Sequence, residues 1–185
     1  MSAILTTVHG SHLYGLANQG SDQDTYTVTT GTNKEYARQT KTGDDDALQL
    51  HLHRFLDQVR DGVPQALEAL WSPVAKIHPD WEPMLRALRP GIHEARARYR
   101  RTILNFAFKH GGRTGAAREH ADRAKLRRHA VRLTINLAQL TETGSIQPRL
   151  NSDQIRLVRH VAALPGDDYA DTLIAMLESA EGWPA

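Results

Sequence analysis

The stretch that most constrains the fold is HGSHLYGLANQGSDQD, residues 9–24, because it separates two segments with the composition of β-strands. Residues 3–9 (AILTTVH) are mostly apolar or β-branched and end at Gly10, and residues 24–30 (DTYTVTT) are followed by the turn signal Gly-Thr-Asn. Runs of this kind are typical of strands. Between them, SHLYGLA is expected to form one or two helical turns. The sequence therefore predicts a strand, a Gly-Ser turn, a short helix and a second strand that starts at an Asp-x-Asp pair.

The Asp-x-Asp pair indicates a metal site. Asp22 and Asp24 are separated by one residue, so in a strand their side chains project from the same face. Two neighbouring carboxylates repel each other unless a cation neutralises them, and oxygen ligands favour Mg²⁺ or Mn²⁺. Gly10 lets the backbone approach closely, Ser11 offers a hydroxyl, and the amides of the following helix suit phosphate. An isolated Asp-x-Asp is more often a solvated turn, but the ordered combination predicts a metal-triphosphate site.

The rest of the chain is predicted to be mainly helical. Residues 47–52 (ALQLHL) alternate Leu with polar residues and predict a third, half-buried strand. Helices are expected over 53–61, over 64–71 with Pro64 at its first position, and over 81–88 with Asp80 as N-cap. Later helices are expected over 93–110, ended by Gly111-Gly112, over 115–142, over 153–164 after Asn151 or Ser152 as cap, and over 169–180. We place a lobe boundary at the break Arg89-Pro90-Gly91, between residues 1–90 and 91–185.

Charge is distributed unevenly along the 185 residues. The net charge is +2, but residues 96–132 hold twelve Lys or Arg against two acids, whereas acids gather earlier, at Asp22, Asp24 and the run 44–46. This asymmetry suggests a metal site that faces a polyanion site. The chain has no cysteine, which excludes disulfides and thiolate metal sites. Without a signal-peptide pattern or an apolar run long enough for a membrane span, we expect a cytoplasmic protein with no membrane partner.

The opening motif resembles that of the DNA polymerase β superfamily of nucleotidyltransferases. It is most similar to predicted nucleotidyltransferases found beside bacterial RNA repair genes and carried by phages, whose opening is Gly-Ser-x-x-Tyr-Gly-Leu. Here that opening is residues 10–16, followed by Ser21-Asp22-x-Asp24. The resemblance continues through HRFLDQVRDGVPQALEALWSP, with Arg54, Phe55, Gly62, Pro64 and Glu68, and through KLRRHAVRL, with Lys125, His129, Arg132 and Leu133. It spans most of residues 3–145.

The resemblance implies an α+β fold, with a small mixed β-sheet nucleotidyltransferase core and flanking helices in residues 1–90, followed by a basic C-terminal helical lobe. It also implies a third carboxylate just before the strand that precedes Arg54. That position falls in the run 44–46. We favour Asp46, which adjoins the strand, over Asp44 and Asp45, while a merely solvated acidic turn stays an alternative.

The activity that the resemblance implies is transfer of a nucleoside monophosphate from an NTP to an acceptor hydroxyl, with release of pyrophosphate. Asp22, Asp24 and Asp46 would hold two Mg²⁺ (or Mn²⁺) ions. The nucleotide would be bound by Gly10, Ser11, Tyr14, Lys125, His129 and Arg132. RNA or tRNA ends are candidate acceptors.

Other polar residues have competing interpretations. Lys125, His129 and Arg132 share one helix face, which either closes over phosphates or is a solvated basic face. Glu68 is interpreted as a structural ion-pair partner near the segment of Arg54. His51 and His53 are interpreted as partners of nearby groups and not as metal ligands.

Two other functions stay open. The chain could be a non-catalytic RNA-binding module, whose binding would depend strongly on salt but not on Mg²⁺. It could also transfer AMP to a protein or to a small molecule. The sequence does not indicate which NTP is used or whether the chain forms oligomers.

Overall fold

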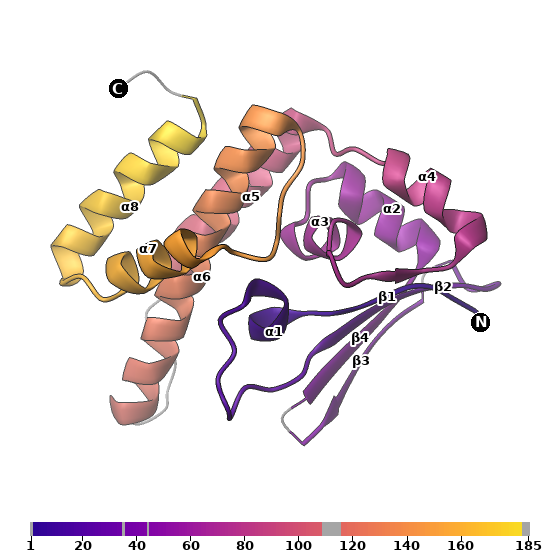
Figure 1. Ribbon diagram of the computed structural model, residues 1–185, viewed down its shortest axis with the longest axis horizontal. Helices are drawn as coiled ribbons and strands as arrows, with labels where there is room; N and C mark the ends of the chain where they lie inside the picture. Colours follow the sequence, from indigo (N-terminus) through magenta and orange to yellow (C-terminus); the bar gives the residue numbers. More distant parts are fainter. Residues whose placement is uncertain (1, 35, 44, 109–115, 183–185) are drawn as a thin grey trace.

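The strands predicted on either side of residues 9–24 form the middle of a mixed five-stranded sheet with the order β3-β4-β2-β1-β5 (Figure 1). The structure is a computed structural model that describes residues 2–34, 36–43, 45–108 and 116–182, with residues 116–122 described by their backbone only. β1 (Ser2–Val8) and β2 (Thr25–Thr30) are antiparallel, and β4 (Asp45–His51) is parallel to β2. The predicted α+β fold, with a mixed sheet, flanking helices and a C-terminal helical region, is confirmed.

Two strands were not predicted from the sequence. β3 (Ala37–Thr42) pairs with β4 at one edge of the sheet, and all six of its residues are exposed. β5 (Lys76–Ile77) pairs with β1 at the other edge and has only two residues. Neither segment has the alternation of apolar and polar residues from which a strand can be predicted.

Short helices follow the strands and cover one face of the sheet. α1 (Gly10–Tyr14) lies between β1 and β2, while α2 (Leu52–Arg60) and α3 (Pro64–Leu70) lie against the sheet (Figure 1). Pro64 opens α3 as predicted, where its missing N–H has no intrahelical partner to lose. The prediction that Asp80 caps the next helix was wrong. A 3₁₀ turn, η1 (Pro79–Trp81), comes first and is capped by His78, so that α4 (Glu82–Ala87) starts after Trp81.

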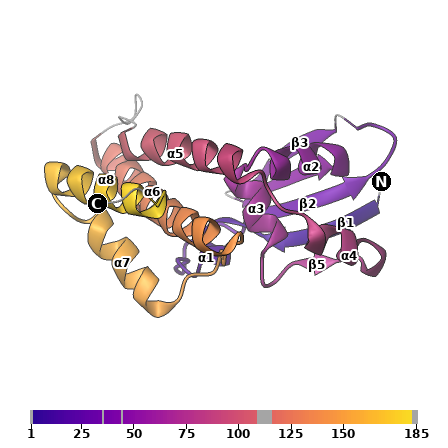
Figure 2. The same cartoon turned by 90° about the horizontal axis from the view of Figure 1, so that it is seen from above.

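The second half of the chain is a group of long helices beside the sheet (Figure 2). They are α5 (Ile92–Phe108), α6 (Ala116–Thr143), α7 (Ser152–Ala162) and α8 (Gly166–Ala180). The break at 89–91 separates α4 from α5 as predicted, whereas the predicted helix end at Gly111-Gly112 lies outside the described residues. No helix among the described residues is sufficiently long and apolar to span a membrane.

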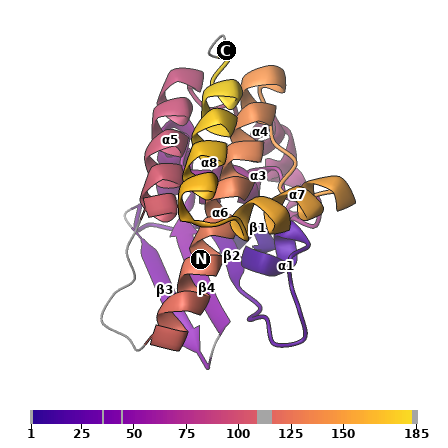
Figure 3. The same ribbon diagram turned by 90° about the vertical axis from the view of Figure 1, so that its left-hand side faces the viewer.

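Helix α6 is the centre of this group. α5, α7 and α8 all pack against it, and Figure 3 shows α5 and α8 beside it. Leu126, Ala130, Leu133, Leu137 and Leu140 recur at spacings of three and four along α6, and all of them but the half-buried Leu126 are buried. However, every residue from 130 to 137 is buried, including polar ones, because neighbours surround this part of the helix on all sides. One hydrophobic core cluster includes residues of the sheet, such as Val28, and residues of α6.

Candidate active site

Gly10 and Asp24 meet where β1 and β2 end. The antiparallel register pairs Val8 with Thr25, and the His9 N–H donates to the Asp24 carbonyl oxygen at 2.8 Å. Gly10 has φ +65°, a conformation that L side chains rarely adopt. A Cβ at this position would lie 2.6 Å from Asp24 Oδ2. The turn therefore favours glycine at position 10, and any Cβ there would force the Asp24 carboxylate to shift.

The Asp-x-Asp segment is also bound to the start of β4. The Asp46 N–H donates to Asp24 Oδ1 at 3.1 Å, and the Gln23 N–H donates to Asp45 Oδ1 at 2.7 Å. These bonds set Asp46 next to Asp24. Asp24 comes just before β2, and the parallel register of β2 and β4 starts one residue later, with Thr25 opposite Ala47. Asp45 is exposed and Asp46 is half-buried, while Asp44 lies outside the described residues. The segment predicted to supply the third carboxylate is thus attached directly to Asp24.

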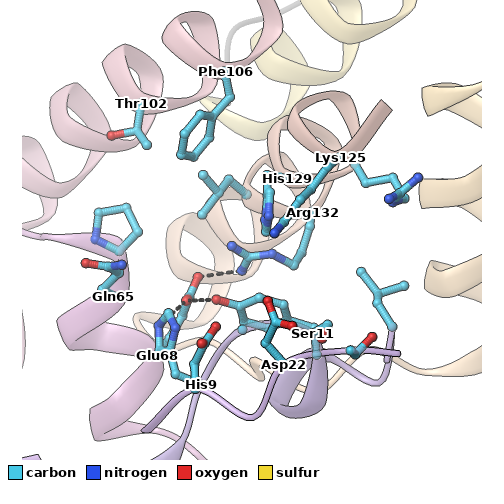
Figure 4. Close-up of a pocket in the computed structure, with 18 of the residues that line it drawn as sticks. His9, Ser11, Asp22, Gln65, Glu68, Thr102, Phe106, Lys125, His129 and Arg132 are labelled. Atoms are coloured by element: carbon cyan, nitrogen blue, oxygen red, sulfur yellow. Dashed lines mark hydrogen bonds and ion pairs between the residues drawn. The ribbon is translucent and has the colours of Figure 1, made fainter. Parts of the chain in front are cut away.

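A cavity of about 680 Å³ opens beside these carboxylates, between the ends of β1 and β2 and the helices α1, α3, α5 and α6 (Figure 4). Eight predicted site residues line it, namely Gly10, Ser11, Tyr14, Asp22, Asp24, Lys125, His129 and Arg132. Asp46 is not among the lining residues. The cavity brings together residues that are more than a hundred positions apart in the chain.

The cavity lining was predicted incompletely. α3 and the turn before it contribute Val63, Pro64, Gln65 and Glu68, and α5 contributes Arg98, Thr102 and Phe106. The α5 residues are spaced by four, which places them on one helix face. This spacing was the only sequence signal for these residues, but residues on every face of α5 have the same spacing. Which face of α5 lines the cavity is determined by the packing of α5 against α6.

A buried carboxylate forms the floor of the cavity. The Tyr14 hydroxyl donates to Glu68 Oε2 at 2.6 Å, Arg132 Nη1 donates to Glu68 Oε1 at 2.5 Å, and Asn136 Nδ2 donates to the same oxygen at 3.4 Å. His9 Nε2 lies 3.3 Å from Oε2, and the Arg132 guanidinium stacks over the Tyr14 ring at 3.6 Å. Glu68 and Arg132 are only 1% and 3% exposed. This cluster (Glu68, Arg132, Tyr14, Asn136 and His9) joins α1, α3 and α6.

The charges in this cluster balance each other. Burial alone would raise the pKa of Glu68, but Arg132 and the neighbouring His9 lower it to about 2. Burial raises the pKa of Tyr14, so its hydroxyl stays protonated and donates to the carboxylate. Glu68 is therefore a structural ion-pair partner, as predicted, but its partner is Arg132, 64 residues away. Arg132 is not on a solvated face.

His129 is an uncharged member of the cavity wall. Burial, followed by the nearby Arg132, lowers the pKa of His129 to about 3. Its ring lies edge-on to Tyr14, with centroids 6.4 Å apart, and 5.8 Å from the Phe106 ring. Near neutral pH, His129 therefore presents a neutral imidazole beside two aromatic rings.

One end of the cavity carries a hydroxyl group and cationic side chains. Ser11 follows the Gly10 turn on α1, and Figure 4 shows Lys125 reaching toward the same side of the cavity. Lys125 is exposed, and Arg128, one turn along α6, is half-buried and also lines the cavity. A hydroxyl and two cations here could hold phosphate groups next to Asp22 and Asp24.

The residues present could hold a divalent cation together with a substrate. Within the described ranges, no group of three or more His, Asp or Glu residues is arranged to hold a metal on its own. Mg²⁺ is commonly held by one or two carboxylates plus substrate phosphates, and Asp22 and Asp24 both line the cavity. His51 and His53 do not line the cavity and contact other groups. His51 Nε2 lies 3.1 Å from the Gly31 carbonyl oxygen, and His53 pairs with Asp57.

The chain matches one family of known proteins. The sequence profile described as RlaP: RNA repair pathway DNA polymerase beta family matches residues 1–182. This match extends past residue 145, where the resemblance of the motifs ends. No curated protein matches the chain.

Proposed function

The chain belongs to the RNA repair pathway DNA polymerase beta family, and from this premise we propose that it is a metal-dependent nucleotidyltransferase that acts on RNA ends. It would transfer a nucleoside monophosphate from an NTP to an acceptor hydroxyl, with pyrophosphate as the second product. The observation that carries this proposal is that Asp22 and Asp24 line the same cavity as Ser11 and Lys125. Carboxylates for a cation and groups for phosphate are thereby adjacent.

Asp22 and Asp24 are the proposed ligands of Mg²⁺ or Mn²⁺, with Asp46 as the third carboxylate. The support for Asp24 is its surroundings. Oδ1 accepts a hydrogen bond from the Asp46 N–H, and Oδ2 lies where any side chain at position 10 would collide with it. Asp46 is supported by the hydrogen bond from its N–H to Asp24 Oδ1. When bound, the cation would neutralise phosphate charge and make the acceptor hydroxyl a better nucleophile.

The protein residues bind and orient the substrate. Ser11 and the amides of the Gly10 turn would hold the outer phosphates, and Lys125 would neutralise part of their charge. The buried Glu68–Arg132 pair joins α6 to α3, and it thereby helps to hold Lys125 of α6 in the wall of the cavity that Ser11 also lines. Alignment of this kind accounts for much of the acceleration in phosphoryl transfer.

The test is a transfer assay with α-³²P-labelled NTPs, Mg²⁺ or Mn²⁺, and a mixture of RNA, tRNA and protein acceptors. The variant Asp24→Asn keeps an oxygen for the Asp46 N–H but removes the charge, and Asp80→Asn is the control because Asp80 is exposed and does not line the cavity. We expect labelled RNA with the wild type and with Asp80→Asn, and a loss of at least about 100-fold with Asp24→Asn.

Other outcomes have separate meanings. Label in protein or in a small molecule would keep the activity but replace the acceptor. If no fraction takes label while the wild type binds RNA in a salt-dependent way, the enzyme proposal is wrong and the RNA-binding module is supported.

A further inference from the structure

One end of the cavity has apolar residues that have no role in the proposed binding of phosphate. Val63 and Pro64, at the start of α3, and Phe106 of α5 line it. Pro64 is buried, and Val63 and Phe106 are half-buried. In Figure 4, Gln65 and Thr102 lie on the side of the cavity away from Lys125 and Ser11, with Phe106 between. Away from Lys125 and Ser11 the cavity therefore has an apolar patch, beside which the polar Gln65 and Thr102 and the cation Arg98 also line the cavity.

An aromatic wall lies at this apolar end. The Phe106 ring is tilted by 40° to the imidazole of His129. His129 is neutral near pH 7 because burial and Arg132 lower its pKa to about 3. Uncharged aromatic faces are the groups on which nucleobases stack, and they do so without regard to base identity.

Hydrogen-bonding groups accompany the apolar wall. Gln65 is exposed, and within the described part of the chain its side-chain amide has no hydrogen-bond partner. This amide offers both a donor and an acceptor. The Thr102 hydroxyl donates to the Arg98 carbonyl oxygen at 2.9 Å, which leaves its oxygen free to accept. A base placed against Phe106 would thus meet groups able to bond to its edge.

We propose that this end holds the nucleobase of the NTP and that Gln65 determines which base is accepted. The inference rests on the proposed function, because it takes the substrate to be a nucleoside triphosphate with its phosphates at Ser11 and Lys125. An NTP has a base, which is apolar on its faces and forms hydrogen bonds at its edge, and a polyanionic triphosphate. The cavity has groups that match the base at one end and groups that match the triphosphate at the other. The cavity volume of about 680 Å³ is typical of pockets for small molecules of this size.

The experiment measures binding rather than transfer. Dissociation constants of ATP, GTP, CTP, UTP and inorganic tripolyphosphate are measured by titration calorimetry with Mg²⁺, for the wild type, Gln65→Ala, Phe106→Leu and Lys125→Ala. We expect the wild type to bind one NTP at least about tenfold more tightly than the others, because pairing to a base edge discriminates more than stacking does. Gln65→Ala should reduce this ratio to below about threefold and leave tripolyphosphate binding unchanged.

The other two variants separate the two ends of the cavity. Phe106→Leu should weaken all four NTPs by about tenfold and leave tripolyphosphate unchanged, because the stacking surface is lost. Lys125→Ala should weaken tripolyphosphate and all NTPs alike. Gln65 is exposed, so Gln65→Ala will fold even if Phe106→Leu does not, which keeps the inference testable.

Three results would overturn the inference. They are a wild type that binds all four NTPs equally or none of them, discrimination that survives Gln65→Ala, and a loss of tripolyphosphate binding in Gln65→Ala and Phe106→Leu that is as large as the loss of NTP binding. Base-selective binding without transfer to any acceptor would refute the proposed function and leave the base site standing. The two failures are therefore distinguishable.

Discussion

At the scale of single residues, Gly10 and Gly144 both have a left-handed backbone but differ in the space around them. The backbone of Gly10 lies at φ +65°, and a Cβ there would collide with Asp24 Oδ2. Gly144 has φ +71° but open space around it, with nothing within 4 Å of a Cβ. Both glycines thus have a backbone conformation that L residues rarely adopt, but only at Gly10 would a Cβ also collide with a neighbouring atom.

We predict that Gly10→Ala destabilises the protein more than Gly144→Ala. Gly144→Ala should lower the free energy of unfolding by about 1–2 kcal/mol, the cost of a left-handed conformation for an L residue. Gly10→Ala should cost more, because the Asp24 carboxylate must also move, and it should reduce nucleotidyl transfer, which Gly144→Ala should not. Urea unfolding and the transfer assay measure both effects. Equal losses of stability would show that Asp24 adjusts freely.

His129 predicts a pH dependence of stability. The pKa of His129 is lowered from 6.5 to about 3, so between these values the unfolded chain binds a proton that the folded chain does not. Its contribution to stability is therefore complete above about pH 6.5 and is lost progressively as the pH falls toward 3.

For the wild type, this one group should remove on the order of 2 kcal/mol from the free energy of unfolding between pH 7 and pH 5. His129→Gln should show a smaller loss over the same range, because glutamine does not titrate. His93→Gln, a variant of an exposed histidine on α5, is the matched control and should behave like the wild type. Urea unfolding at the two pH values measures the difference. If His129→Gln loses as much as the control, water reaches the imidazole and lets it titrate.

The residues of the candidate site could be predicted where one short stretch holds them. Gly10, Ser11, Asp22 and Asp24 occur within fifteen positions, and all of them line the cavity. The partner of Glu68 could not be predicted, because Arg132 is 64 residues away and a sequence does not show which buried charges meet. Phe106 and Gln65 were missed for the same reason, since only tertiary packing brings α3 and α5 to one cavity.

At the scale of secondary structure elements, predictions succeeded where local signals were strong. β1, β2 and β4 have apolar or alternating patterns, and the long helices have clear periodicity and end signals. β3 is exposed throughout and is held by pairing with β4, a feature that its own sequence does not encode. The helix after residue 150 had two candidate caps, and the structure selects Asn151. Its side chain accepts from the Gln154 N–H at 2.9 Å, and Gln154 Oε1 accepts from the Asn151 N–H at 3.0 Å.

This reciprocal cap predicts different effects for the two neighbouring residues. Asn151→Ala should lower the free energy of unfolding by about 1 kcal/mol, because two hydrogen bonds at the start of α7 are lost. Ser152→Ala is the matched control and should change it by less than about 0.5 kcal/mol. Thermal unfolding of both variants measures these changes. Equal losses in the free energy of unfolding would show that both residues cap the helix.

At the scale of the whole molecule, the hydrophobic core, a buried ion pair and the cavity lining each include residues of both predicted lobes. The hydrophobic core includes Val28 and Leu67 from residues 1–90 and Tyr99 and Leu137 from residues 91–185. The buried Glu68–Arg132 pair crosses the same boundary, and so does the lining of the cavity. A lobe that unfolded alone would leave a buried charge without its partner, which is among the more costly changes in a protein interior.

We therefore predict that the chain unfolds in a single transition. In a Trp183→Phe background, tryptophan fluorescence reports on Trp71 and Trp81, in residues 1–90, whereas far-UV circular dichroism is dominated by the long helices of residues 91–185. The two urea curves should coincide. Glu68→Ala should shift both to lower urea by the same amount, with a loss of about 3–5 kcal/mol, because Arg132 is then buried without a carboxylate. Curves that separate in the wild type would show that residues 1–90 and 91–185 are independent folding units. A shift of only one curve in Glu68→Ala would show that the pair stabilises one half alone, and the cavity would then be a contact between two domains that are each stable without the other.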